Sequence, residues 1–260
     1  MKSRNEFKVT YLNGPTMIVE ISGLKFITDP TFDPSGSKYV IGKDLTVDKL
    51  TDPQPAKLDD IDYVLLSHDQ HHDNYDGKGR IFSRGVKNIF TTVEGASRLG
   101  GNAIGIATWE SVTIDTPDGN KIRITSTPAR HGPAGFEKMS GPVTGFILTV
   151  IGLPALEIYI TGDTVYYPGI AQVAHKFKPN FVFIFAGGAQ PRGPFNVTMG
   201  TNDALDTAAE FSRATIIPLH YEGWSHYTQG GDVLSRAFEL LGISHRLRLL
   251  KPGQEEVLSV

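Results

Sequence analysis

Cysteine is missing from all 260 residues of the chain. A chain without cysteine forms no disulfide, has no thiolate nucleophile and offers no sulfur ligand to zinc. Any metal site must therefore use nitrogen and oxygen ligands, which come from histidine, aspartate, glutamate and asparagine side chains. The eight histidines of the sequence become the first candidates for such a site.

Long apolar segments and a strong net charge are missing as well. No apolar run of about 18 residues occurs, so no membrane-spanning helix is predicted. Met1 to Phe7 are mostly polar and precede no apolar stretch, so no signal peptide is predicted. The formal charge is only -3 and no long Lys/Arg run occurs, which disfavours a nucleic-acid partner. We therefore expect a cytoplasmic protein that acts on a small molecule, and the composition leaves a homo-oligomer open.

The pattern of apolar residues predicts one domain over residues 1–260, with strands first and then strands alternating with helices. Two stacked sheets with helices on their outer faces are the expected result. The strands are predicted at residues 7–12, 17–21, 24–28, 61–66, 89–92, 121–127, 144–150, 157–161, 181–185 and 214–219. The helices are predicted at residues 94–99, 169–177, 202–213 (with Thr201 as a cap) and 232–241.

The densest group of potential metal ligands lies in residues 67–76, SHDQHHDNYD, directly after the apolar run 61–66. This segment holds three histidines and three aspartates. Imidazole and carboxylate together are the ligand set for zinc, manganese or iron. A solvated polar loop is the alternative interpretation, but the number of ligand-type side chains at a strand end favours a metal site.

Three more ligand-type residues repeat this pattern, because His131, Asp163 and His220 each follow an apolar run. Taken alone, each is more often a hydrogen-bonded polar residue, a turn former or a helix cap. Strand ends gather on one edge of a sheet, however, and binding sites are built on such edges. The four segments together therefore predict one shared metal site.

This order of a histidine cluster, a histidine, an aspartate and a histidine resembles the metallo-β-lactamase superfamily of metal-dependent hydrolases. The local sequence looks most like its lactonase-like branch, which includes the ascorbate-6-phosphate lactonase family. The resemblance implies an α/β fold, a four-layer αβ/βα sandwich in which helices flank two mixed β-sheets and metals lie along one edge. The matching segments are residues 10–30, 65–74, 128–133, 159–164 and 218–224.

The chain departs from the superfamily signature His-x-His-x-Asp-His. An ungapped reading from His68 places Gln70 at the second histidine and His72 at the aspartate. A bulge of one residue after His68 instead aligns His71 and Asp73 with the signature and leaves only Asn74 substituted. We prefer the bulged reading because it keeps three of the four ligand types.

In this reading the resemblance implies two neighbouring metal positions that share Asp163. A neutral asparagine oxygen is a poorer zinc ligand than imidazole, so the second position should bind more weakly or favour manganese. One or two divalent ions are expected, zinc or manganese first and iron or nickel as alternatives. Gln70 and His72 remain alternative ligands. The implied ligands are His68, His71, His131 and the bridging Asp163 for the first metal, with Asp73 and His220 for the second.

The implied activity is hydrolysis of a small-molecule ester, lactone or phosphoester by a metal-activated hydroxide. Asp73 and Asp163 are the candidate catalytic residues, because either carboxylate can accept the proton of the water. Two other functions stay open, a metal-dependent nuclease or phosphodiesterase of the same fold and a non-catalytic metal-binding protein. Residues 35–57 and 136–142 are the expected specificity loops.

Several residues near the site receive supporting roles. Asp29 and Asp69 are predicted to hold the far nitrogens of ligand imidazoles. Arg130, Lys138 and Arg192 are candidates for an anionic substrate group, although solvated surface positions are the preferred interpretation. Aromatic and acidic residues next to Asp163 and His220 are predicted to line the cleft, namely Tyr166, Tyr167, Tyr221, Glu222 and Trp224. The remaining histidines are predicted to be structural or solvated, namely His175, His226 and His245.

Overall fold

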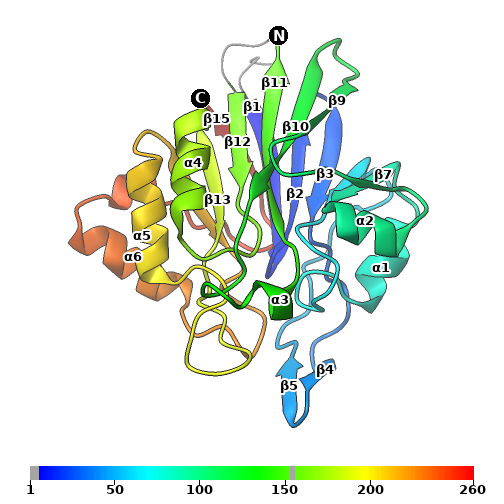
Figure 1. The fold of residues 1–260 in the computed structure, drawn as a ribbon. Helices are drawn as coiled ribbons and strands as arrows, with labels where there is room; N and C mark the ends of the chain where they lie inside the picture. The colour runs from blue at the N-terminus through cyan, green and yellow to red at the C-terminus, as the bar shows by residue number, and fades with distance from the viewer. Residues whose placement is uncertain (1–5, 153–155) are drawn as a thin grey trace.

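Seven strands form the first β-sheet in the computed structural model, which describes residues 6–152 and 156–260 (Figure 1). The order across the sheet is β15-β1-β2-β3-β6-β7-β8. Pairing is antiparallel from β15 to β3 and parallel from β3 to β8. The bounds are β1 (Glu6–Asn13), β2 (Thr16–Ile21), β3 (Leu24–Thr28), β6 (Tyr63–Leu65), β7 (Asn88–Thr91), β8 (Ala103–Gly105) and β15 (Glu255–Ser259).

Six strands form the second sheet in the order β14-β13-β12-β11-β10-β9, again antiparallel in one half and parallel in the other. Every residue of β13 (Phe181–Phe185) is buried, as expected for a parallel strand covered on both faces. The other bounds are β9 (Ser111–Asp115), β10 (Lys121–Pro128), β11 (Thr144–Ile151), β12 (Leu156–Ile160) and β14 (Thr215–Leu219).

Three apolar layers hold the helices and sheets together. The largest layer lies between the two sheets and includes Tyr11, Phe26 and Phe183. A second layer packs α4 (Pro168–Lys176), α5 (Thr201–Glu210) and α6 (Gly231–Leu240) on the second sheet, and a third lies beside α1 (Gly77–Ser83) and α2 (Val93–Leu99) (Figure 1). The predicted αβ/βα sandwich with two mixed sheets is therefore confirmed. No helix of the described residues is long and apolar enough to cross a membrane.

Most predicted elements are present within a few residues, but short ones were missed. Residues 35–57, expected to be a loop, contain the hairpin β4 (Lys38–Gly42) and β5 (Leu45–Asp48), which protrudes from the sandwich (Figure 1). The short helices α1 and α3 (Glu137–Ser140), the 3₁₀ turn η1 (Ser244–Arg246) and the strands β8, β9 and β15 were also missed. Such short elements carry little sequence periodicity and are stabilised by tertiary packing.

The start of α5 corrects one detail of the sequence prediction. Thr201 is the first helical residue rather than the cap, and Gly200 takes the N-cap position. The Thr201 hydroxyl and amide both donate to the side-chain oxygen of Gln229, each at 2.6 Å. The first N–H group of α5, which has no partner within the helix, thus donates a hydrogen bond to Gln229, a residue distant in the sequence. The local sequence could not indicate this partner.

A fully buried ion pair joins the base of the β4–β5 hairpin to the end of the histidine-rich segment. The Lys49 ammonium lies 3.1 Å from Asp76 Oδ2 and donates to the carbonyl of Thr31 at 2.9 Å, and both side chains of the pair are 0% exposed. The Asp76 carboxylate also accepts the amides of Asp33 at 2.7 Å and Gly79 at 2.8 Å, the latter as the cap of α1. One carboxylate therefore holds the hairpin, α1 and the histidine-rich segment together.

We predict that Asp76→Ala lowers the free energy of unfolding by about 3–5 kcal/mol, because it leaves the Lys49 ammonium buried without a counter-charge. The double variant Asp76→Ala with Lys49→Met should recover part of this loss, since no unpaired charge then remains. Urea denaturation measures both values. Asp115→Ala, which removes an exposed partner of Lys121, is the control and should change stability little. A double variant no more stable than Asp76→Ala would contradict the explanation.

Candidate metal centre

The structure brings the four distant strand ends to one place. His68, His131 and Asp163 each lie three residues beyond β6, β10 and β12, and His220 directly follows β14. All four are at most 5% exposed. All six residues named as metal ligands fall into two groups of converging donor atoms that share Asp163. The groups are His68, His71, His131 and Asp163, and Asp73, Asp163 and His220.

Three imidazoles and one carboxylate form the first group. His71 Nδ1 lies 2.9 Å from His68 Nε2 and 3.0 Å from His131 Nε2. Asp163 Oδ2 lies 3.6 Å from the His131 nitrogen and 3.9 Å from the His68 nitrogen. Ligand atoms placed tetrahedrally about 2.0–2.1 Å from a zinc ion are separated by about 3.3 Å. The observed separations scatter around that spacing, so this group has the dimensions of a four-coordinate metal site.

Backbone and hydroxyl partners orient the imidazoles of His68 and His131. His131 Nδ1 donates to the carbonyl of Val197 at 2.7 Å, so the proton lies on Nδ1 and the lone pair of Nε2 faces the cluster. His68 Nδ1 lies 2.9 Å from the hydroxyl of Ser67. Both rings therefore present Nε2 to the shared point, which is the orientation that a metal ligand requires.

Burial keeps the first group of imidazoles neutral. Burial, and then the neighbouring His131, lower the pKa of His71 to about 4. Burial likewise lowers the pKa of His131 to about 4 and holds the pKa of His68 well below its usual range. A neutral imidazole is the form that binds a metal. The three nitrogens are therefore available near neutral pH without loss of a proton.

The second group is smaller and more acidic. His220 Nε2 lies 3.4 Å from Asp73 Oδ2 and 3.5 Å from Asp163 Oδ1. Burial raises the pKa of Asp163, whereas the imidazoles of His226 and His220 overcome burial and hold the pKa of Asp73 well below its usual range. Asn74 donates its amide nitrogen to Asp163 Oδ1 at 3.1 Å, so it supports the carboxylate instead of facing the group with its oxygen.

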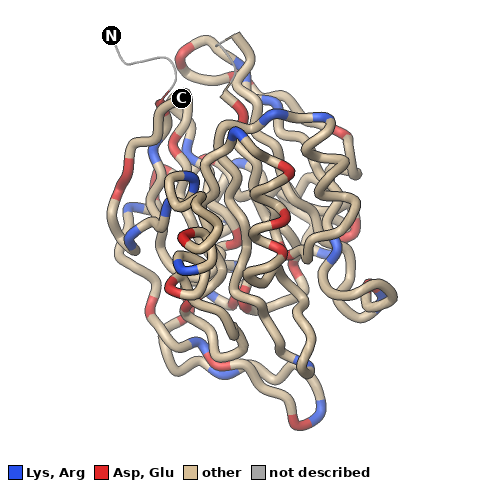
Figure 2. Tube along the Cα trace, turned by 90° about the vertical axis from the view of Figure 1, so that its left-hand side faces the viewer, with Lys and Arg blue, Asp and Glu red and all other residues tan. Residues whose placement is uncertain are grey.

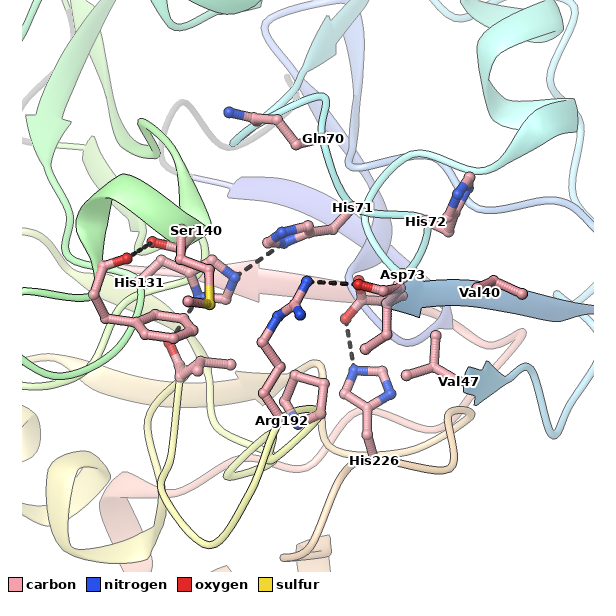
Figure 3. Close-up of a pocket in the computed structure, with 15 residues that line it drawn as sticks. Val40, Val47, Gln70, His71, His72, Asp73, His131, Ser140, Arg192 and His226 are labelled. Carbon is pink, nitrogen blue, oxygen red and sulfur yellow. Dashed lines mark hydrogen bonds and ion pairs between the residues drawn. The ribbon is translucent and has the colours of Figure 1, made fainter. Parts of the chain in front are cut away.

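His226 was missed by the sequence interpretation, which treated it as structural or solvated. Its Nε2 lies 2.9 Å from Asp73 Oδ2, and its side chain lines the pocket above the site (Figure 3). The one available signal was its position six residues after His220, across Gly223. It follows no apolar strand directly, so the strand-end pattern could not identify it.

The backbone is constrained where the second group forms. His220 has φ 58°, in the left-handed region that side chains with a Cβ rarely adopt, and its amide donates to the Gly14 carbonyl at 2.7 Å. Gly162, next to Asp163, has φ 62°, and an added Cβ would lie 2.5 Å from the Thr144 carbonyl oxygen. Glycine is therefore required beside Asp163, and the tight packing fixes the direction of this carboxylate.

Two predicted supporting roles were wrong. Asp29 Oδ1 accepts the Ser67 amide at 2.6 Å, so it fixes the backbone before His68 rather than an imidazole. Asp69 pairs with Arg98, whose Nε lies 2.9 Å from its carboxylate. Both carboxylates were assigned from sequence proximity, which does not reveal the direction of a side chain after a sharp turn.

The alternative ligands and the aromatic residues also take other positions. His72 stacks on Tyr39 of the hairpin, with ring centroids 4.4 Å apart, and His72 and Gln70 belong to neither group of donor atoms. Trp224 is buried and packs against Tyr39, so it belongs to the core and not to the cleft. The described pocket lining includes none of the aromatic and acidic residues predicted there, namely Tyr166, Tyr167, Tyr221, Glu222 and Trp224.

A cavity of about 240 Å³ opens above the site (Figure 3). Both predicted specificity loops contribute to it, through the β4–β5 hairpin and through the segment around α3. The polar lining residues are Gln70, His71, His72, Asp73, His131, Ser140, Arg192 and His226. The apolar lining residues are Val40, Ile41, Val47, Phe136, Met139, Pro191 and Val197.

The donor atoms fit a bound divalent ion. Asp163 Oδ2 and His220 Nε2 are buried and have no hydrogen-bond partner among the described residues. An unpaired buried carboxylate oxygen is costly, and a metal ion removes that cost. The nitrogen and oxygen donors suit zinc, manganese or iron, and they do not distinguish among these metals.

A family model described as "Beta-lactamase superfamily domain" matches residues 25–221, which is well over half of the chain. The chain therefore belongs to the beta-lactamase superfamily. Within it, the chain is 28% identical over 258 residues to a UPF0173 metal-dependent hydrolase of Pelotomaculum thermopropionicum, covering 95% of this chain and 98% of the relative. It is also 24% identical over 255 residues to the UPF0173 protein YddR of Bacillus subtilis, with the same two coverages.

Solved structures share the fold at low sequence identity. An isothiocyanate hydrolase from Delia radicum gut bacteria superposes with a TM-score of 0.82 at 22% identity, covering 97% of this chain and 99% of that one. Igni18, a metallo hydrolase from Ignicoccus hospitalis, has a TM-score of 0.71 at 22% identity, with coverages of 98% and 99%. YhfI of Bacillus subtilis, a metallo-β-lactamase fold protein, has a TM-score of 0.61 at 14% identity, with coverages of 97% and 99%. These similarities establish the metallo-β-lactamase fold of the chain.

The buried histidines predict acid sensitivity of the metal-free protein. In the unfolded chain His71 and His131 return to the ordinary histidine pKa of about 6.5, whereas in the folded protein the pKa of each is about 4. The unfolded state therefore binds more protons between these values, and stability falls as pH decreases from about 6.5 to about 4. Urea denaturation at several pH values measures this slope. His71→Asn should reduce it and His245→Asn should not, so equal slopes in both variants would contradict the prediction.

Proposed function

We propose that this protein is a metal-dependent hydrolase that cleaves a small-molecule ester, lactone or phosphoester. Membership of the superfamily and similarity to metal-dependent hydrolases support the general class. The observation that carries the proposal is the pair of buried donor groups, which open together into one pocket. Such a site has both the ligands for a metal and the space for a substrate.

The volume of the cavity and the distribution of charged residues on the protein both support a small substrate. A cavity of about 240 Å³ holds a compact molecule and not a polymer. Acidic and basic residues are interspersed over the face drawn in Figure 2, instead of forming a basic path. A nuclease binds its substrate through many phosphate contacts, so this alternative is disfavoured.

A bound divalent ion supplies two effects in such a site, a lowered pKa of water and a polarised carbonyl or phosphoryl oxygen. The residues of the chain handle the proton. His220 and His226 keep Asp73 ionised, so its carboxylate is ready to accept the proton of water. The side chain of His226 lines the pocket and contacts the Asp73 carboxylate. Asp73 and His226 together can therefore return the proton to the leaving oxygen as the substrate bond breaks. Asp163, whose pKa is raised by burial, serves as the shared ligand.

The range of test substrates follows from the relatives and the sequence. The lactonase-like sequence segments place lactones first, followed by aryl esters and phosphodiesters. The isothiocyanate hydrolase of the same fold adds isothiocyanates to the panel.

We predict that metal-loaded protein hydrolyses at least one member of this panel and that a chelator abolishes turnover. His68→Ala and His131→Ala should each lower kcat/KM by at least about 100-fold, because each removes a ligand of the first group. Steady-state assays with metal analysis of the same samples measure both effects. His175→Ala, at an exposed position on α4 outside both donor groups and the pocket lining, is the control.

The outcome also separates an enzyme from a non-catalytic metal-binding protein. Loss of activity with an intact far-UV circular dichroism spectrum supports catalysis by the metal centre. Unfolding of His68→Ala, combined with no turnover of any substrate by the metal-loaded wild type, indicates a structural metal instead.

The second group should bind its metal more weakly than the first, because Asn74 offers Asp163 an amide hydrogen where the superfamily signature has a histidine. We predict that Asn74→His increases the affinity of the second position by about 10- to 100-fold. Elemental analysis after dialysis at limiting zinc measures the stoichiometry, which should rise towards two ions per chain. An unchanged stoichiometry in the folded variant would contradict the bulged alignment of residues 68–74.

A further inference from the structure

Arg192 is the one lysine or arginine among the described residues that line the pocket. It lies in the segment after β13, and its side chain is half-buried. In Figure 3 this side chain extends between His71 and His131 on one side and Asp73 on the other. The sequence interpretation preferred a solvated surface position, and the structure corrects that preference.

The orientation of this guanidinium is set by the hairpin. One Nη group donates to the carbonyl of Ile41 in the β4–β5 hairpin at 2.7 Å. Among the described residues no carboxylate forms an ion pair with Arg192, whereas Lys49 pairs with Asp76 and Arg98 pairs with Asp69. A guanidinium has five N–H donors, so the tether leaves several free to face the cavity.

Arg192 lines the same pocket as His71, Asp73 and His131, so its positive charge lies beside the metal centre. A half-buried cation without a protein counter-charge favours an anionic ligand, and a guanidinium binds carboxylate or phosphate oxygens through paired hydrogen bonds.

The remaining wall of the cavity limits what else the ligand contains. The hairpin contributes Val40, Ile41 and Val47, and the opposite side contributes Phe136 and Met139. Within about 240 Å³ these side chains accommodate a compact apolar body. Besides Arg192 and the residues of the metal centre and their partner His226, the polar residues of the described lining are Gln70, His72 and Ser140. The cavity thus combines one oxyanion site with an apolar wall beside the metal centre.

We propose that Arg192 is a specificity-determining residue that selects small, largely apolar substrates carrying one oxyanion, a carboxylate or a phosphate. This assignment rests on the proposed hydrolase function and names the substrate class for that site. The oxyanion binds the guanidinium while the apolar body lies against the hairpin, and this arrangement directs the scissile carbonyl or phosphoryl group towards the metal centre.

Three five-membered lactones with the same ring and different substituents at one ring carbon test this proposal. The substituents are a carboxylate, a phosphonate and an isopropyl group, the last being a neutral group similar in shape to the carboxylate. A pH-indicator assay measures kcat and KM for ring opening by the metal-loaded protein, and isothermal titration calorimetry measures binding of each lactone.

We expect the wild type to favour at least one anionic lactone over the isopropyl lactone in kcat/KM. Arg192→Met should reduce that ratio by about 10- to 100-fold, mainly through KM, because it removes charge-assisted hydrogen bonds. Arg192→Lys should restore part of the ratio, since the charge returns without the paired geometry. Lys138→Met removes one positive charge from an exposed position on α3 outside the pocket lining and should leave the ratio unchanged.

Two results would overturn the proposal. One is a wild type that treats the neutral and the anionic lactones alike. The other is an Arg192→Met variant that weakens all three lactones equally, which would assign Arg192 only the role of holding Ile41. Failure of the proposed hydrolase function is recognised separately, as absence of turnover with every lactone and with every other member of the substrate panel, and calorimetry still decides the role of Arg192 in that case. Comparison of kcat/KM for the carboxylate lactone and the phosphonate lactone shows which oxyanion the site prefers.

Discussion

The metal centre depends on how the two sheets are joined at one edge. The Thr144 amide of the second sheet donates to the Ser67 carbonyl at 3.0 Å, and the Ser67 amide donates to buried Asp29 of the first sheet at 2.6 Å. Gly162 packs against the same point, where any side chain would collide with Thr144. Residues from both sheets are therefore fixed relative to one another immediately beside His68. Without that junction, donors from four strands would not converge.

Electrostatics divides the site into two unlike halves. Three imidazoles with lowered pKa values, of which His68 and His131 are buried and His71 is partly exposed, form a neutral nitrogen-rich group, whereas Asp73 and Asp163 make the other group acidic. His226 adds a hydrogen bond to Asp73 on the pocket side, and Asn74 adds one to Asp163 on the buried side. The two halves therefore present different donor atoms, mainly nitrogen in the first group and mainly oxygen in the second.

The β4–β5 hairpin connects the site to its substrate pocket. The buried pair of Lys49 and Asp76 fixes its base, Tyr39 stacks on His72, and Arg192 holds Ile41. Each contact links the hairpin to a segment that also carries site residues. The shape of the pocket is consequently coupled to the integrity of the metal centre, although the tip of the hairpin is exposed.

The sequence alone determined the sandwich fold and the six side chains that converge, because buried strands and ligand-type residues at their ends are local patterns. Only the tertiary structure decided the roles of His226, Asp29 and Arg192. Their functions depend on the directions of side chains after turns and on partners far away in the chain. Hydrophobic periodicity records which faces are buried, but it carries no information about which polar groups meet across a junction between two sheets.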